Sequence, residues 1–243
     1  MLHARLDPVG QVATASNVTL LCRLSPLKQS GDDPDHSDQL LAVYKPQRGE
    51  TPLWDFPSGT LHRREVAAYV LDRELGWGLV PPTVLREDGP YGRGSVQLFV
   101  EHDPQQHYFA LVQAGDASVV AQLQRMVVFD LIANNADRKA SHVLLDGAGR
   151  IRLVDHGVCF HEDAKLRTVA WEFAGEPIPE SLRSGVAELT GRLADHDDPV
   201  NRGLAALLTA GEVAATARRA RAVADRERFP PPTGRRPYPW PPL

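Results

Sequence analysis

Two acidic residues bracket a short apolar hairpin near the middle of the chain, in the run NNADRKASHVLLDGAGRIRLVDHG at 134–157. Apolar residues flank the turn Gly147–Gly149, which predicts two antiparallel strands. Asp137 precedes the first strand and Asp155 ends the second, so we expect the hairpin to bring their carboxylates together. A charge at the end of a buried strand is costly unless it is paired or binds a cation. This run therefore constrains the fold more than any other feature.

The chain before the hairpin is rich in predicted strands. β-branched and apolar residues predict two strands around 10–24, one at 39–46, and two more at 79–87 and 94–102. A helix is expected over Leu61–Leu75, with Thr60 as N-cap and Gly76 just past its end.

The chain around and after the hairpin is predicted to be helical. Apolar residues at helical spacing over 116–135 predict a long helix that leads directly into the hairpin run, and 210–229 predicts another. The fold class is thus α+β and two-lobed, with a β-rich lobe at 1–102 and an α-rich lobe at 103–229. The proline-rich tail at 230–243 is expected to be extended or disordered.

Composition excludes several classes of protein. The 243 residues carry a net charge of −4, which gives no support for nucleic-acid binding. No apolar stretch approaches the roughly 20 residues of a membrane span, and no basic segment with an apolar core begins the chain. We therefore expect a cytoplasmic protein without stable membrane insertion. Cys22 and Cys159 lie in no metal-binding spacing, and two buried free thiols are the preferred interpretation.

The polar residues in and before the run match the requirements of phosphoryl transfer. That reaction needs a cation for the nucleotide phosphates, a carboxylate to hold it, a metal ligand, and a group for the attacking hydroxyl. Lys45 ends an apolar strand, Glu65 follows on the first helix, and Asp137, Lys139 and Asp155 lie in the run. Two alternatives without a catalytic role stay open. The side chains of Lys45 and Glu65 would then be ordinary exposed residues, and residues 135–139 would form an Asx turn at a helix end that carries basic residues.

This arrangement resembles the phosphatidylinositol 3-/4-kinase branch of the protein-kinase-like superfamily. That branch carries Asp-Arg-His-x-x-Asn, then a hairpin, then Asp-Phe-Gly or a variant. Here the corresponding residues are Asp137-Arg138-Lys139-Ala140-Ser141-His142 and Asp155-His156-Gly157. With Lys45 in VYKP and Glu65, the resemblance spans about residues 10–160. HipA-type protein kinases are similar over much of the same core.

The resemblance implies a role for each matching residue, with ATP and Mg²⁺ or Mn²⁺ as cofactors. Asp137 becomes the catalytic-loop acid, with Arg138 and Lys139 beside it, and Asp155 the principal metal ligand, with His142 as the second. Lys45 binds phosphate and Glu65 pairs with it. The turn at 14–17, with Ser16 and Asn17, would cover the phosphates, and the linker at 97–102 would bind adenine through Gln97, Val100 and Glu101.

Two residues depart from the family pattern. Lys139 replaces a histidine, at the spacing that protein kinases use for a phosphate-contacting lysine. His142 replaces the metal-binding asparagine, and imidazole suits Mn²⁺ or Zn²⁺ better than Mg²⁺. Three alternatives follow: an enzyme that uses Mn²⁺, an enzyme with one metal on Asp155, or an inactive pseudokinase. A transition-metal site of His142, His156 and His161 is a further interpretation.

The expected function is transfer of the γ-phosphate of ATP to a hydroxyl of a small alcohol, an inositol-type compound or a lipid head group. Lys165 and Arg167 follow the second acid, where inositide kinases bind acceptor phosphates, although a solvated loop explains them as well. The alternatives are an ATP-binding regulatory pseudokinase, a HipA-like protein Ser/Thr kinase and a nucleotidyl transferase. The acceptor is thus a small molecule or a protein, and the oligomeric state is open.

Overall fold

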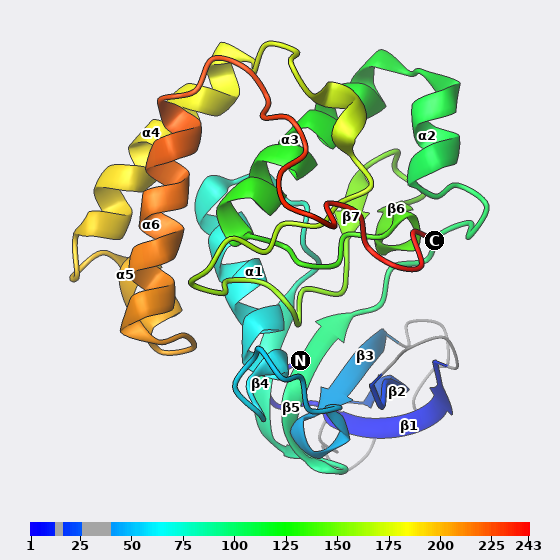
Figure 1. Cartoon of the computed structure of the whole chain (residues 1–243). Coiled ribbons are helices and arrows are strands. Elements are labelled where there is room, and N and C mark those ends of the chain that lie inside the picture. Colours follow the sequence, from blue (N-terminus) through cyan, green and yellow to red (C-terminus); the bar gives the residue numbers. More distant parts are fainter. Residues whose placement is uncertain (13–16, 26–39) are drawn as a thin grey trace.

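The computed structural model describes residues 1–12, 17–25 and 40–243. The predicted loop between the second and third strands lies almost wholly outside these residues, as does Ser16 of the predicted phosphate turn. The described residues form an antiparallel sheet that lies below a larger helical part, and helix α1 reaches from one to the other (Figure 1). The predicted α+β class with a β-rich N-terminal part and an α-rich C-terminal part is confirmed.

The sheet has five antiparallel strands in the order β1-β2-β3-β5-β4. Its strands are β1 (Arg5–Gln11), β2 (Leu20–Ser25), β3 (Leu41–Pro46), β4 (Thr83–Gly89) and β5 (Gly92–Leu98). Successive side chains of a strand point to opposite faces. Ala42 and Tyr44 of β3 are therefore buried in the small core of the sheet, while Lys45 lies on the other face. This alternation directs the Lys45 ammonium toward the helical part.

The helical part holds the larger hydrophobic core. Its helices are α1 (Leu61–Leu75), α2 (Tyr108–Ala114), α3 (Ala117–Ala133), α4 (Glu180–Ala194), α5 (Pro199–Ala205) and α6 (Ala210–Ala224). The predicted hairpin is confirmed as β6 (Val143–Leu145) and β7 (Ile151–Leu153), and it packs into the same core. Short 3-10 turns are η2 (Gln47–Gly49), η3 (Ala140–His142) and η4 (Trp171–Phe173). Lobe boundaries at residues 102 and 229 stay predictions.

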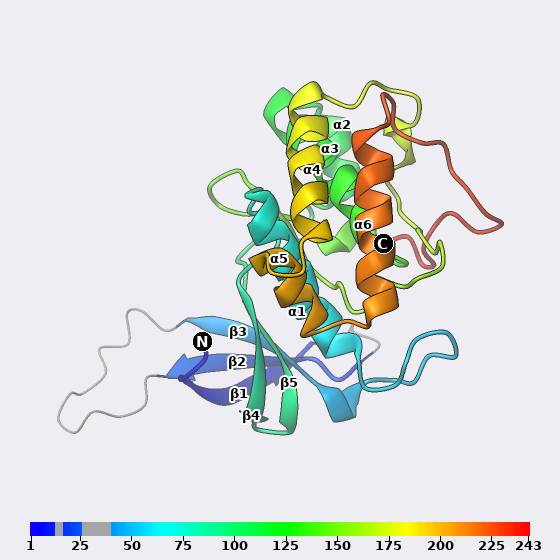
Figure 2. The same cartoon turned by 90° about the vertical axis from the view of Figure 1, so that its left-hand side faces the viewer.

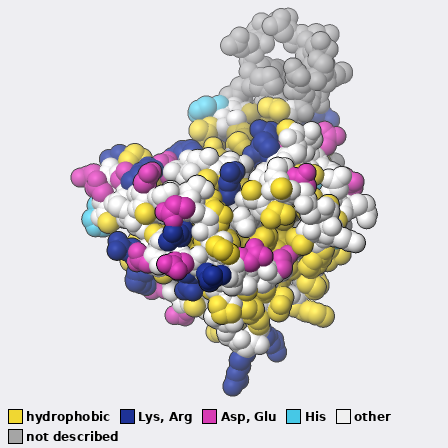
Figure 3. Space-filling model, turned by 90° about the horizontal axis from the view of Figure 1, so that it is seen from above, with side chains coloured by type: hydrophobic (Ala, Val, Ile, Leu, Met, Phe, Trp, Pro, Cys, Tyr) yellow, Lys and Arg dark blue, Asp and Glu magenta, His cyan; other side chains and the backbone are white. Residues whose placement is uncertain are grey.

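Charged side chains do not gather into a single-sign patch on the upper face of the helical part. Lysine and arginine side chains alternate there with aspartate and glutamate (Figure 3). Within the described residues, every helix is too short or too polar to cross a lipid bilayer.

Helix α1 belongs to the helical part by its contacts, although it lies between strands β3 and β4 in the sequence. Figure 2 shows it running beside α5. The guanidinium of Arg64 is buried, donates to Cys159 O at 2.7 Å and pairs with Glu212 of α6. At the other end of the helix, Glu74 pairs with Arg192 of α4 at 2.5 Å. These two ion pairs fix both ends of α1 to the helical part.

The first turn of α1 is capped by Glu50 and not by the predicted Thr60. The Thr60 backbone is itself helical, and its hydroxyl donates to Pro57 O. Glu50 reaches the helix from the preceding loop, where its Oε1 accepts from His62 N at 2.9 Å and contacts His62 Nδ1 at 2.6 Å. Burial acts to raise the pKa of Glu50, but hydrogen bonds from His62 and from the Leu61 backbone outweigh it and lower that pKa. A carboxylate also suits the positive end of the helix dipole.

Glu50→Ala should therefore lower the free energy of unfolding by about 1–2 kcal/mol, as loss of a helix N-cap does. Urea denaturation measures this change. Thr60→Ala is the matched control and should cost less, because the Thr60 hydroxyl caps no N–H of the first turn. An equal or larger loss in Thr60→Ala would contradict the assignment of Glu50 as the cap.

Candidate active site

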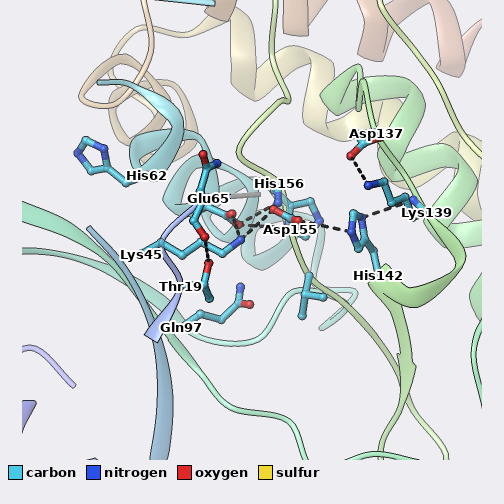
Figure 4. A network of polar contacts seen from close by, with 12 residues as sticks. Thr19, Lys45, His62, Glu65, Gln97, Asp137, Lys139, His142, Asp155 and His156 are labelled. Atoms are coloured by element: carbon cyan, nitrogen blue, oxygen red, sulfur yellow. Dashed lines mark hydrogen bonds and ion pairs between the residues drawn. The ribbon is translucent and has the colours of Figure 1, made fainter. Parts of the chain in front are cut away.

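Lys45 lies between two carboxylates that come from distant parts of the chain. Its Nζ is 2.5 Å from Glu65 Oε1 of α1 and 2.9 Å from Asp155 Oδ1, just after β7 (Figure 4). Burial acts to lower the pKa of Lys45, but the charges of Asp155 and Glu65 outweigh it and hold the pKa above its ordinary value. The charge of Lys45 in turn holds the pKa of Asp155 well below its usual range. Both groups are therefore charged at neutral pH, and the structure brings together three of the predicted site residues.

The sequence predicted that Asp155 ends the second strand of the hairpin. In the structure, Asp155 lies two residues beyond β7 and has a φ of 61°. This left-handed conformation costs a non-glycine residue about 1–2 kcal/mol. Hydrogen bonds hold the backbone on both sides: Val154 O accepts from Arg138 Nη1 at 2.9 Å, and His156 N donates to Glu65 Oε2 at 2.9 Å. The strained backbone turns the Asp155 carboxylate toward Lys45, and half of that side chain remains exposed.

The side chain of Arg138, predicted as a catalytic residue, lies within the helical part and binds other residues of the protein. The side chain is fully buried and binds both carboxylate oxygens of Asp130 on α3, at 2.8 and 2.9 Å. Its Nη2 also donates to His156 Nε2 at 2.9 Å, which places the imidazole proton on Nδ1. A guanidinium enclosed in this way positions the backbone around Asp155 and cannot contact a substrate.

Asp137 and Lys139 form a second charged pair on the loop at 134–142, the predicted catalytic loop. Lys139 Nζ is 3.4 Å from Asp137 Oδ2, and both side chains are partly exposed. Burial raises the pKa of Asp137 to about 6, with a further rise from the Asp155 charge and an opposing effect of Lys139. A carboxylate with this pKa is ionised at neutral pH and is basic enough to accept a proton from a hydroxyl during reaction.

His142 lies next to the remaining oxygen of Asp155, with its Nε2 3.4 Å from Oδ2. Burial lowers the pKa of His142 to about 4, so its imidazole is neutral at physiological pH. Two ligands at about 2.1 Å from one octahedral ion lie about 3 Å apart, so this spacing suits a shared divalent cation. The Nδ1 of the ring accepts a long hydrogen bond of 3.4 Å from Lys139 N. A metal bound to Nε2 would leave the ring proton on Nδ1, and this hydrogen bond would then be lost.

Asp155 and His142 are too few ligands to enclose a metal by themselves. Among the described residues, no group of three or more His, Cys, Asp and Glu side chains could hold a metal ion. Mg²⁺ is commonly held by one or two protein ligands together with nucleotide phosphates and water. The residues present fit that kind of site. They do not fit the alternative transition-metal site, because His156 Nε2 is occupied by Arg138.

The residues that were predicted to contact the nucleotide have different surroundings in the structure. Asn17 Oδ1 accepts from Thr51 N at 2.7 Å, so this side chain ties the residues just before β2 to the β3–α1 loop. Gln97 lies inside β5, paired with strands on both sides, and its side chain donates to Thr83, which corrects its place in the adenine-binding linker. Val100 and Glu101 follow the strand as irregular backbone and stay predictions as adenine contacts.

Several basic residues have partners that the sequence did not indicate. Lys165 pairs with Asp55 at 2.9 Å, and Arg167 Nη1 donates to Ala136 O at 3.5 Å. Arg219 donates to Ile132 O and His161 O from within the helical part. Cys22 and Cys159 are free and buried, as predicted.

Sequence reasoning missed two residues that build the site, Asp130 and His156 as partners of Arg138. Asp130 had a detectable signal, because it is a lone acid among the apolar residues of helix 117–133. A buried carboxylate needs a charged partner, and Arg138 follows eight residues later. His156 gave no comparable signal, since its tautomer and burial depend on the tertiary fold.

Comparison with known proteins gives this arrangement a family. The pattern of the family described as phosphatidylinositol 3- and 4-kinase matches residues 59–196, which include Glu65, Asp137 and Asp155. The chain belongs to this family. Membership supports a kinase, that is, a phosphotransferase, and kinases of this type use ATP and a divalent metal.

Two relatives extend the comparison. Protein Rv2133c of Mycobacterium tuberculosis is 39% identical over 272 residues, which cover 99% of this chain and 93% of that protein. Phosphatidylinositol 4-kinase gamma 4 of rice (Oryza sativa subsp. japonica) is 33% identical over 141 residues. That match covers 49% of this chain and only 24% of the rice protein, so the kinase-like region is what the two share.

Solved structures support the fold. The structure of hydra Fam20 with sugar aligns with a TM-score of 0.58 at 16% identity, over 91% of this chain and 84% of that one. The Helicobacter pylori proinflammatory kinase CtkA aligns with a TM-score of 0.52 at 11% identity, over 93% and 94%. At these identities the likeness concerns the fold alone.

The buried pair of Arg138 and Asp130 generates a stability prediction. Arg138→Met leaves the buried Asp130 carboxylate without its charged partner, with the amide of Asn135 as the remaining side-chain donor, which should cost about 3–5 kcal/mol of unfolding free energy. The double variant Arg138→Met/Asp130→Leu removes both charges and should recover a large part of that loss. Chemical denaturation of the two single variants and the double variant gives the coupling energy. Additive losses would show that the two side chains do not depend on each other.

Proposed function

We propose that this protein transfers the γ-phosphoryl group of ATP to a hydroxyl of a small alcohol, an inositol-type compound or a lipid head group. The observation that carries the proposal is the position of Lys45, bound at once by Glu65 and Asp155. A lysine held in this way is ready to exchange one carboxylate contact for phosphate oxygens, without having to be drawn in from solvent.

Each residue then has one task in the reaction. Lys45, held by Glu65, binds phosphate oxygens of the nucleotide. Asp137 orients the acceptor hydroxyl and takes its proton as the new P–O bond forms and the bond to ADP breaks. Lys139 neutralises negative charge on the transferred group. Asp155 and His142 would hold the divalent cation, which supplies further charge neutralisation when bound.

The retained residues favour an active enzyme over a regulatory pseudokinase. The chain keeps the four acidic and basic residues that the reaction needs, which are Lys45, Glu65, Asp137 and Asp155. His142 departs from the family pattern but still offers a metal-binding nitrogen. A protein Ser/Thr acceptor, as in HipA-like kinases, is the second candidate. No feature of the described residues favours nucleotidyl transfer.

Transfer of label from γ-labelled ATP is the direct test. We expect the wild-type protein, with Mg²⁺ or Mn²⁺, to label one member of a panel of polyols, inositol compounds, lipid head groups and protein substrates. Asp155→Asn should abolish labelling, because it removes the charged metal ligand while keeping the side-chain shape. Lys45→Met should weaken ATP binding about tenfold to a hundredfold, the value of a charged hydrogen bond.

Two outcomes would contradict the proposal. Equal labelling by wild type and Asp155→Asn would remove Asp155 from the reaction. Binding of ATP by the wild type without transfer to any acceptor, and without hydrolysis, would instead support the pseudokinase. Asp163→Asn is a matched control, since Asp163 is an exposed carboxylate that follows the same segment, and this variant should keep full activity.

The role of His142 gives a separate prediction on metal preference. His142→Asn replaces an imidazole nitrogen with an amide oxygen, a harder donor that suits Mg²⁺. The ratio of the Mg²⁺-supported rate to the Mn²⁺-supported rate should therefore rise in the variant. Steady-state rates over a series of metal concentrations measure it. An unchanged ratio would leave Asp155 as the one ligand from the catalytic loop and hairpin.

A further inference from the structure

The proline-rich C-terminal segment, which the proposed reaction does not use, lies directly on the catalytic loop. We call residues 237–242 the strap. The chain crosses the front of the hairpin β6–β7 and ends near it (Figure 1). Pro242 O accepts from Ala140 N at 2.8 Å, next to Lys139. Pro237 O accepts from Thr168 N and from Trp171 Nε1, each at 3.0 Å.

The strap extends a ladder of backbone hydrogen bonds that joins the catalytic loop to the segment after Asp155. Arg138 N donates to Arg167 O at 2.9 Å, and Val169 N donates to Arg138 O at 3.2 Å. Thr168, between these two partners, bonds outward to Pro237. The catalytic loop, the 167–169 segment and the strap therefore lie side by side, and the strap returns to the catalytic loop at Ala140.

The donors that the strap satisfies are buried. Ala140 is fully buried and Thr168 nearly so. Ala140 N belongs to the first residue of η3, which has no acceptor within its own turn. A buried N–H without a partner is unfavourable, so the strap completes the hydrogen bonding of the loop that carries Lys139 and His142.

The composition of the strap suits this task. Proline has no backbone N–H, so a proline-rich segment offers carbonyl acceptors without donors that need partners of their own. Proline also holds the segment extended before it docks, which reduces the entropy lost on docking. Pro239 is buried, and Phe229, before the strap, is buried and contacts Phe173 at 5.9 Å between ring centroids. The strap is therefore held at its start by the hydrogen bonds to Pro237 O, in its middle by the burial of Pro239, and at its end by the hydrogen bond to Pro242 O.

We propose that the strap is a positioning element for phosphoryl transfer, which holds the catalytic loop so that Lys139 and Asp137 meet the transferred group and the acceptor. This inference rests on the proposed function. It requires that the strap act on the rate of transfer and not on the binding of ATP, because Lys45 and Glu65 lie on β3 and α1, outside the ladder.

A chain ending at Arg236 tests the inference. We expect kcat to fall about tenfold to a hundredfold, as for a small displacement of a catalytic group, while the affinity for ATP measured by calorimetry stays at the wild-type value. Addition of a peptide of residues 230–243 should restore part of the rate. Full-length Leu243→Ala is the matched control and should keep wild-type kcat, since this side chain is exposed.

Trp171→Phe tests the same contact in the intact chain, because it removes the indole N–H donor to Pro237 O and keeps an aromatic ring. Its kcat should fall with unchanged ATP affinity. Amide hydrogen exchange gives a readout that does not depend on activity: Ala140 and Thr168 should lose protection in the truncated chain. Loss of ATP binding together with kcat would overturn the inference, as would unchanged kcat and unchanged protection in both variants. If the wild type transfers no phosphate, the proposed function fails, and exchange at Ala140 still decides whether the strap holds the loop.

Discussion

The geometry of the site depends on one fully buried guanidinium, that of Arg138. It is paired with Asp130 of α3, and from that fixed position it binds Val154 O and His156 Nε2, on either side of Asp155. Asp155 can keep its left-handed backbone because these contacts and the bond from His156 N to Glu65 offset the strain. The carboxylate then faces Lys45. A fully buried side chain thus determines where the proposed metal ligand lies.

A second constraint joins this geometry to the sheet. Arg64 and Glu65 are neighbours on α1, and their side chains bind different partners. Arg64 binds Glu212 and Cys159 O and so fixes the helix to the helical part, while Glu65 contacts Lys45 and His156 N. The sheet contributes Lys45 to a site whose other members are already held in place. These contacts hold Lys45, Glu65 and Asp155 close together, which limits the reorganisation that nucleotide binding would require.

The sequence was sufficient where function depends on local pattern. The hairpin and the limits of helix 61–75 follow from periodicity and turn residues, and the pairing of Lys45 with Glu65 was expected from the family resemblance. It was insufficient where a residue acts across the fold. Arg138 looked catalytic because it lies beside Asp137, and Thr60 looked like a helix cap because it precedes the helix. The structure buries Arg138 against Asp130, eight residues earlier on α3, and brings Glu50 to the helix from the preceding loop.

In the proposed reaction, Asp155 and Lys45 form the metal and phosphate site. A crystal structure with a non-hydrolysable ATP analogue and Mn²⁺, in which anomalous scattering locates the metal, tests it most directly. We expect the ion about 2.1 Å from a carboxylate oxygen of Asp155, with the triphosphate in contact with Lys45 Nζ and the γ-phosphate directed toward Lys139. A metal bound away from Asp155, or a triphosphate that leaves Lys45 paired only with its carboxylates, would contradict it.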